Sequence, residues 1–237
     1  MTVLSVNINK FATLRNARGG NNPDVIKAAQ DCERFGAQGI TVHPRPDERH
    51  IRYDDVIRLS DVVTTELNIE GYPDDRFMEL VLRVKPTQAT MVPDGPDVLT
   101  SNAGWDTITH KDQLTEVITE LQQNGIRTSI FTDPAPEMVE GAANIGTNRI
   151  ELYTEPYAQQ YPSDRDKAIS DYKKAAMVAK KLDIGINAGH DLDMNNLGYF
   201  ISEIPETLEV SIGHALICDA IYLGLENTVQ LYLNKVR

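Results

Sequence analysis

The feature that most constrains this sequence is a repeated unit of a helical pattern, a glycine and a short β-branched run. Junctions of this kind stand at Gly36, Gly125, Gly146 and Gly185. A glycine just past a helix and before an apolar strand is typical of the connections in βαβ units. We therefore predict eight strands, over residues 3–8, 39–43, 64–69, 88–92, 127–131, 149–152, 184–188 and 207–211.

Helical patterns fill the spaces between these runs. We predict helices over residues 23–35, 53–60, 74–84, 111–123, 135–144, 165–182, 194–202 and 214–222, with one more over 225–235. Pro23 suits the first turn of its helix, with Asn22 as the cap. No linker or low-complexity segment divides residues 1–237, so eight alternating units predict a single α/β domain, a closed (β/α)₈ TIM barrel. The alternative is an open doubly wound sheet, but neither G-x-G-x-x-G nor a P-loop pattern occurs.

Charge and composition exclude several classes of protein. The net charge of −12 argues against general nucleic-acid binding. Residues 1–52 nevertheless contain 8 Lys+Arg against 5 Asp+Glu, whereas the rest contains 15 against 30, which fits a small phosphorylated substrate. No apolar run reaches the roughly 20 residues that cross a membrane, and the N-terminus does not resemble a signal peptide. We expect no membrane partner and a cytoplasmic location, with Cys32 and Cys218 as free thiols.

Residues 39–52 join a buried strand to an unusually basic loop. The loop contains two histidines and three arginines and is stiffened by Pro44 and Pro46: His43, Arg45, Arg49, His50 and Arg52. Arginine offers a permanently charged fork, and histidine exchanges a proton near neutral pH. This loop therefore predicts a site for an anionic ligand.

Other strand ends add acid and base groups. In a barrel, the active site lies at the carboxyl ends of the strands, and four candidates stand there: His43, Glu70, Glu151 and His190. Converging carboxylates and imidazoles can act as general acids and bases. A structural role is the alternative for each, and Glu151 in particular could pair with Arg149 or Arg127.

Two anion sites are predicted. Gly213 and His214 open a helix after the eighth strand, a recurrent phosphate position in barrels. A second anion could be held by Arg45, His50 and Thr100. Two such sites would suit a reaction that joins two phosphorylated molecules.

Metal binding is the competing explanation for the histidines. Two segments contain ligand-like groups, His43–Asp47–Glu48–His50 and His190–Asp191–Asp193. Neither has the H-E-x-x-H spacing or a C-x-x-C partner, and neighbouring arginines would repel a cation. We predict no metal site.

Several long motifs resemble the pyridoxine 5′-phosphate synthase family, of the deoxyxylulose-phosphate-dependent route to vitamin B6. The motifs run along nearly the whole chain and are residues 6–8 (VNI), 12–19 (ATLRNARG), 39–51 (GITVH-x-R-x-D-x-RHI), 68–70 (NIE), 99–100 (LT), 150–151 (IE), 187–190 (NAGH) and 212–215 (IGHA). The resemblance implies a (β/α)₈ barrel with extra helices, assembled as a homo-octamer, with no metal and no organic cofactor.

The resemblance also implies a reaction. A transferase-class, ring-forming synthase would condense 1-deoxy-D-xylulose 5-phosphate with 3-amino-2-oxopropyl phosphate, giving pyridoxine 5′-phosphate, phosphate and water. By position, His43 and Glu70 would accept protons, His190 would donate one, and Glu151 would stabilise the transition state. The amino-ketone phosphate would be held by Asn7, Arg18, Gly213 and His214, and the sugar phosphate by Arg45, His50 and Thr100. The loop over 94–106 is the candidate lid.

The chain departs from the common family pattern at two places. Asn9-Lys10 stands where many members have Asp-His, and Asp191 where many have glycine, although all three remain candidate substrate-binding residues. The rival hypothesis is a phosphosugar aldolase or isomerase on the same fold, with Lys10 as a Schiff-base nucleophile. A barrel that only binds a phosphorylated metabolite is the non-enzymatic alternative.

Overall fold

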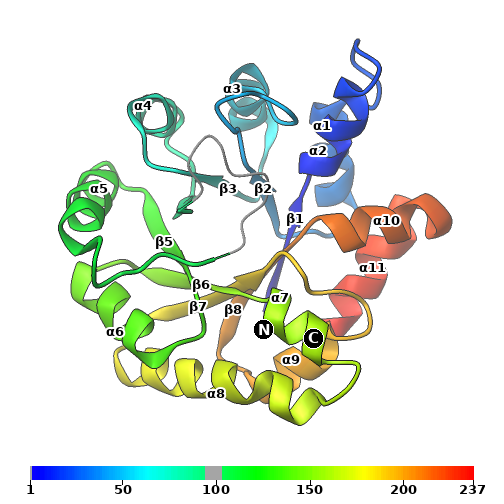
Figure 1. Ribbon diagram of the computed structural model, residues 1–237. Coiled ribbons are helices and arrows are strands. Elements are labelled where there is room, and N and C mark those ends of the chain that lie inside the picture. Colours follow the sequence, from blue (N-terminus) through cyan, green and yellow to red (C-terminus); the bar gives the residue numbers. More distant parts are fainter. Residues whose placement is uncertain (1, 94–102) are drawn as a thin grey trace.

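A computed structural model describes residues 2–93 and 103–237 and contains a closed barrel of eight parallel strands. Each strand pairs with the next in sequence, and the last pairs with the first (Figure 1). The strands are β1 Val3–Asn7, β2 Gly39–Val42, β3 Glu66–Gly71, β4 Gln88–Met91, β5 Arg127–Thr132, β6 Arg149–Tyr153, β7 Gly185–Gly189 and β8 Thr207–Ile212. The predicted TIM-barrel fold is confirmed.

Eleven helices within the described residues surround the barrel (Figure 1). They are α1 Asn9–Asn16, α2 Val25–Arg34, α3 Tyr53–Val62, α4 Asp75–Val84, α5 Lys111–Gln123, α6 Pro136–Ile145, α7 Glu155–Gln160, α8 Arg165–Lys181, α9 Leu197–Glu203, α10 His214–Leu223 and α11 Leu225–Lys235. The sequence predicted all except α1 and α7. Helix α1 buries only Ala12 and Arg15, and α7 has 6 residues, so neither carries an apolar stripe that could be recognised.

The predicted start of α2 is wrong by two residues. The N-cap is Asp24 and not Asn22, because the Asp24 carboxylate accepts hydrogen bonds from the backbone N–H groups of Ile26 and Lys27. Pro23 therefore precedes the helix. An aspartate at this position satisfies two donors that the first turn leaves unpaired.

The strands alternate between an apolar outer face and a polar inner face. In β2, Ile40 and Val42 belong to the apolar core between barrel and helices, and all four residues of the strand are buried. The Thr41 hydroxyl instead joins a chain of buried polar groups, 2.7 Å from Ser5 Oγ and 3.4 Å from Asn68 Nδ2. The barrel interior is therefore polar, and the main apolar core lies outside it.

Charged residues fill the amino end of the barrel. Arg149 Nη1 lies 3.1 Å from the buried Glu209 carboxylate, and Arg127 pairs with Glu66. Arg127 also donates to Gln88 Oε1 at 2.8 Å. The alternative in which one of these arginines pairs with Glu151 is wrong, because both arginines are engaged at the opposite end of the strands.

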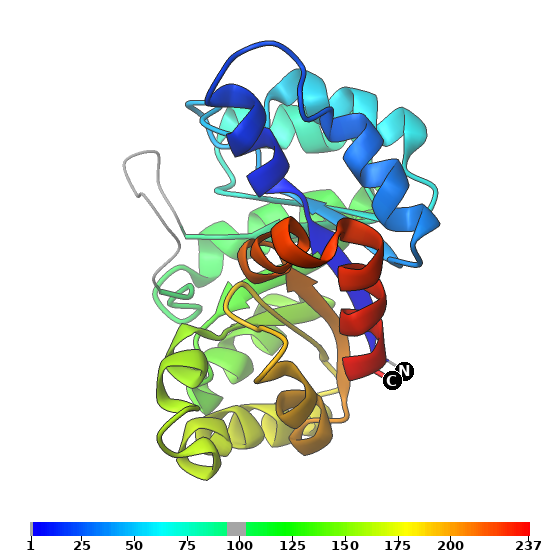
Figure 2. The ribbon, with the colours of Figure 1, turned by 90° about the vertical axis from the view of Figure 1, so that its right-hand side faces the viewer.

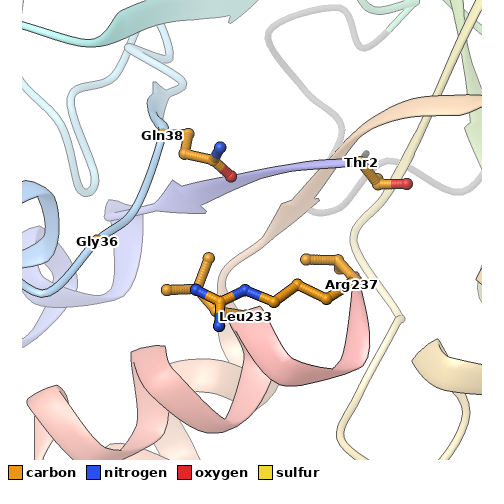
Figure 3. Close-up of a pocket in the computed structure, with 6 residues that line it drawn as sticks. Thr2, Gly36, Gln38, Leu233 and Arg237 are labelled. Carbon is orange, nitrogen blue, oxygen red and sulfur yellow. The ribbon is translucent and has the colours of Figure 1, made fainter.

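A small pocket of about 100 Å³ lies at the same amino end, between the start of β1, the turn after α2 and the end of α11 (Figure 3). Its lining includes Thr2, Gln38 and Arg237. Figure 1 and Figure 2 both show the two termini side by side there. This pocket is far from the strand ends that carry the predicted site. Among the described residues, no helix combines the length and the apolar character needed to cross a membrane.

Candidate active site

The carboxyl ends of the strands bring the four predicted acid/base residues together. Glu70 and Glu151 lie within β3 and β6, while His43 and His190 directly follow β2 and β7. Three of these groups, from Glu70, Glu151 and His190, have a side-chain N or O atom within 4.8 Å of the others. Parallel strands all end on one side of a barrel, so residues distant in sequence converge there.

Glu70 is the centre of this cluster and is completely buried. Its Oε2 atom lies 3.7 Å from His190 Nε2 and 3.9 Å from His43 Nδ1. Asn7 Nδ2 donates to the same oxygen at 3.4 Å. The other oxygen, Oε1, has no hydrogen-bond partner among the described residues. A buried carboxylate oxygen without a partner is costly, and such atoms gather at functional sites.

His190 connects Glu70 to Glu151. Its Nδ1 atom lies 3.4 Å from Glu151 Oε1, and its ring meets the Phe131 ring edge-on at 5.1 Å. The backbone of His190 is left-handed, with φ of 77°. The preceding Gly189 has no room for a side chain, because a Cβ atom would lie 2.7 Å from Glu151 Oε1. Close packing and an unusual backbone therefore fix the imidazole between two carboxylates.

The two histidines of the cluster have opposite protonation tendencies. Burial by itself lowers the pKa of His190, but the Glu70 and Glu151 carboxylates outweigh it and raise the pKa to about 9. Burial, followed by the positive charge of Arg45, lowers the pKa of His43 well below its ordinary value. These shifts favour a protonated His190 and a neutral His43 near neutral pH.

Glu151 is the second unusual carboxyl group. It is completely buried, and neither of its oxygens has a hydrogen-bond partner among the described residues. Burial and then the charge of Glu70 raise the pKa of Glu151 above its ordinary range. Two carboxylates near one imidazole share protons as a unit, so their titrations are coupled.

The arginines of the loop after β2 differ in their surroundings. Arg45 is buried, and its positive charge contributes to the lowered pKa of both His43 and His50. Arg49 pairs with Asp47 at 2.7 Å. Arg52 donates instead to Asn16 at 2.9 Å.

One ring nitrogen of His50 is bound by the backbone of the next residue. Its Nδ1 accepts the backbone N–H of Ile51 at 2.9 Å. Burial, followed by the charges of Arg45 and Lys10, lowers the pKa of His50 to about 4. The neutral ring therefore carries its proton on Nε2, which is the donor available to a ligand.

The predicted amino-ketone phosphate site is assembled only in part. Gly213 is the N-cap of α10 and packs against Asn7, since an added Cβ would lie 3.0 Å from Asn7 Cβ. His214 begins the helix and is exposed, so backbone N–H groups and an imidazole are available to an anion. Arg18 lies beyond the end of α1 and is exposed.

The positions that depart from the family pattern have definite environments. Asn9 Oδ1 accepts the backbone N–H of His43 at 2.9 Å, and its own N–H donates to Asn7 Oδ1 at 3.1 Å, so it supports His43. Lys10 is exposed on α1. Burial raises the pKa of Asp191, while the nearby positive charge of His190 opposes that rise.

Some predicted residues are not tested. Thr100 and the central part of the candidate lid, residues 94–102, lie outside the described residues. At the described end of that loop, Trp105 is buried and stacks on Tyr72 with a ring separation of 5.7 Å.

The cluster of residues that could bind a metal ion differs from both segments that the sequence suggested. Within residues 2–93 and 103–237, the groups placed to share one cation are Glu70, Glu151 and His190. These three groups can share protons as well as bind a cation, because they combine two carboxylates with one imidazole.

Sequence reasoning missed the residues that support the loop. Arg15 and Asn16, at the end of α1, contact the backbone around His50. Both belong to the motif over residues 12–19, but α1 itself was not predicted, so nothing indicated which side chains face the loop.

Comparisons with known proteins give a family. The protein-family model described as pyridoxal phosphate biosynthesis protein PdxJ matches residues 4–237 of this chain. The chain is 62% identical over 237 residues to the pyridoxine 5′-phosphate synthase of Cytophaga hutchinsonii, covering 100% of both chains. It is also 62% identical to that of Parabacteroides distasonis over 98% of both, and 61% identical to that of Flavobacterium johnsoniae over 100% of both.

Two solved structures with the same fold are distant from this chain in sequence. Phosphoribosyl anthranilate isomerase from Thermotoga maritima has a TM-score of 0.65 at 11% identity, covering 100% of this chain and 98% of that one. A tryptophan synthase chain from M. tuberculosis has a TM-score of 0.67 at 12% identity, covering 100% and 92%. At such identities these structures support the fold alone.

Proposed function

The chain belongs to the pyridoxine 5′-phosphate synthase family, and from this we propose that it condenses 1-deoxy-D-xylulose 5-phosphate with 3-amino-2-oxopropyl phosphate. The products would be pyridoxine 5′-phosphate, phosphate and water. The observation that supports the proposal most strongly is that Glu70 Oε2 lies between two imidazoles, 3.7 Å from His190 Nε2 and 3.9 Å from His43 Nδ1.

The reaction needs several proton transfers. The amine of one substrate attacks the ketone of the other, and a C–N bond forms as water leaves. Phosphate then leaves, a carbon–carbon bond closes the ring, and a second water is lost in the net reaction as the ring becomes aromatic. In this proposal His190 gives a proton to a leaving oxygen, and His43 and Glu70 remove protons from carbon or nitrogen. Glu151, whose charge is suppressed by burial, stabilises the transition state beside His190.

Two phosphate sites would hold the substrates together. Arg45, the neutral Nε2–H donor of His50 and Thr100 would bind the sugar phosphate. The amino-ketone phosphate would lie at the start of α10, against Gly213 and His214, with Asn7 and Arg18. Fixing both substrates removes much of the entropic barrier to a bimolecular step. In this proposal Asn9 acts by supporting His43, Lys10 adds positive charge at the rim, and Asp191 borders the phosphate that His214 contacts.

No group in this scheme requires a metal or an organic cofactor. The substrate amine itself forms the imine, so Lys10 has no covalent role. We further propose the transferase-class assignment, a cytoplasmic location and a homo-octamer. The large exposed apolar side chains at the end of α10 support an assembly, since Ile221 and Tyr222 are 74% and 89% exposed. Light scattering of the purified protein measures the number of subunits.

The decisive experiment combines the purified protein with both substrates, in the absence of added metal. We expect pyridoxine 5′-phosphate and phosphate to appear together. Chromatography detects the first product, and a phosphate assay detects the second. Each substrate alone is the control. Absence of product with both substrates present would overturn the proposal, and borohydride-dependent labelling of Lys10 by a ketose phosphate would favour an aldolase.

A further inference from the structure

The last residue of α1 holds the backbone of the loop that carries His50. Asn16 Nδ2 faces three successive carbonyl oxygens, those of Glu48 at 3.3 Å, Arg49 at 3.2 Å and His50 at 2.8 Å. One amide group shared among three carbonyls fixes the path of the loop as well as its position. The loop has no regular secondary structure of its own over these residues.

Asn16 is itself held in place. Its Oδ1 atom accepts from Arg15 Nε at 3.0 Å and from Arg52 Nη2 at 2.9 Å. These two bonds leave the amide NH₂ group directed at the loop. The orientation of Asn16 is therefore determined by its neighbours.

Arg15 anchors the arrangement in the protein interior. It is 1% exposed and forms a two-pronged ion pair with Asp55 of α3, at 2.6 and 2.8 Å. Its Nη2 atom also donates to the His50 carbonyl at 3.1 Å. A buried, bidentate pair holds its geometry more strictly than an exposed one. The His50 carbonyl thus receives donors from both Arg15 and Asn16.

The orientation of the His50 imidazole depends on the position of its backbone. Because Nδ1 accepts the N–H of Ile51, the ring orientation depends on the chain at residues 50 and 51. A shift of the backbone would move the Nε2–H donor away from a bound phosphate. Small displacements of a positioned group can cost a large factor in binding or rate.

We propose that Asn16, fixed by Arg15 and Asp55, is a positioning residue that holds His50 for the phosphate of the sugar substrate. The inference rests on the proposed function, because it assigns the sugar phosphate to this loop. It adds residues that contact no substrate and act through His50.

The test compares Asn16→Ala and Asn16→Asp with the wild type. Asparagine-to-aspartate replacement retains the Oδ1 contacts to Arg15 and Arg52 but removes the donor to the three carbonyls. For both variants we expect the KM for the sugar phosphate to rise about tenfold, with the KM for the amino-ketone phosphate within about twofold. Asn124→Ala is the matched control, since Asn124 Nδ2 also donates to a backbone carbonyl, that of Glu120 at 3.0 Å, at an exposed position.

Direct binding separates this inference from the proposed function. Calorimetric titration with 1-deoxy-D-xylulose 5-phosphate alone needs no turnover, and we expect weaker binding by both variants and an unchanged value for the control. If both KM values rise equally, or if binding of the sugar phosphate is unchanged in a folded variant, the inference is wrong. Lack of product with the wild type would instead count against the proposed function.

Discussion

The two ends of the barrel bury carboxylates in opposite ways. At the amino end, Glu209 receives Arg149 at 3.1 Å, with Arg127 nearby at 3.8 Å and the Asn187 amide at 3.1 Å. At the carboxyl end, both oxygens of Glu151 lack a hydrogen-bond partner among the described residues. Both carboxyl groups are almost completely buried.

The difference shows how one scaffold separates stability from chemistry. Burial raises the pKa of Glu209 while the two arginines oppose that shift, so its charge is compensated within the fold. Glu70 and Glu151 instead share one neighbour, since His190 Nε2 lies 3.7 Å from Glu70 and its Nδ1 lies 3.4 Å from Glu151. Unsatisfied polar atoms reduce the stability of the carboxyl end, and ligands can satisfy them.

The largest expected effect is on turnover. Replacing Glu70 by Gln removes a proton acceptor and the charge that keeps His190 protonated. We expect kcat to fall by about 10²–10⁴-fold, while the melting temperature stays the same or rises. Steady-state kinetics measures kcat, and thermal unfolding of the same sample measures the melting temperature. A variant that loses stability without losing turnover would contradict the assignment of chemistry to the carboxyl end.

The corresponding change at the amino end affects stability. Glu209→Ala leaves the half-buried Arg149 charge without its buried carboxylate partner, and breaking such a pair costs up to about 3–5 kcal/mol. We expect a large loss in the free energy of unfolding and an unchanged kcat per folded molecule. Denaturant unfolding at a temperature where the variant is folded, with an active-site titration, checks this. A catalytic defect in the folded fraction would show that the two ends are coupled.

Within the carboxyl end, His43 and Arg45 should separate turnover from binding. His43→Ala removes the neutral acceptor and should mainly lower kcat. Arg45→Ala removes a buried charge beside His50 and should mainly raise the KM for the sugar phosphate, by about tenfold or more. Initial rates over a matrix of both substrate concentrations distinguish the two. Equal effects of both variants on both parameters would contradict this division of roles.

The smallest expected effect is a pH dependence of stability. The pKa of His190 is raised from 6.5 to about 9 by the carboxylates, so the stability due to its protonated form is fully present below about pH 6.5. That contribution is lost as the pH rises through about 9. We expect the wild-type melting temperature to fall across this range, by a few degrees more than that of His190→Gln. If the melting temperatures of the wild type and of His190→Gln change equally with pH, the protonated form of His190 does not contribute to stability.

The sequence predicted the strands well because their signals are local. A β-branched run after a glycine identifies a strand without reference to the rest of the chain, and all eight predicted strands overlap those observed. The errors have physical causes. Helices α1 and α7 lack an apolar stripe, and the cap of α2 depended on which of two polar side chains, Asn22 or Asp24, reaches the first turn.

The site was predictable in composition and not in arrangement. Strand-end position indicated His43, Glu70, Glu151 and His190, because parallel strands deliver such residues to one side of a barrel. The order of contacts, with Glu70 between two histidines, depends on the register and closure of the sheet. The raised pKa of His190 and the lowered pKa of His43 depend on that order and on burial.

By itself, therefore, the sequence determined the alternation of strands and helices, the residue types at the strand ends, and a family resemblance that the comparisons confirm. The tertiary structure decided which charges are paired. Arg127 and Arg149 meet Glu66 and Glu209 at one end, whereas Glu151 lies beside His190 at the other. Pairing depends on distances of a few ångströms between segments far apart in the chain, and only the closed barrel sets those distances.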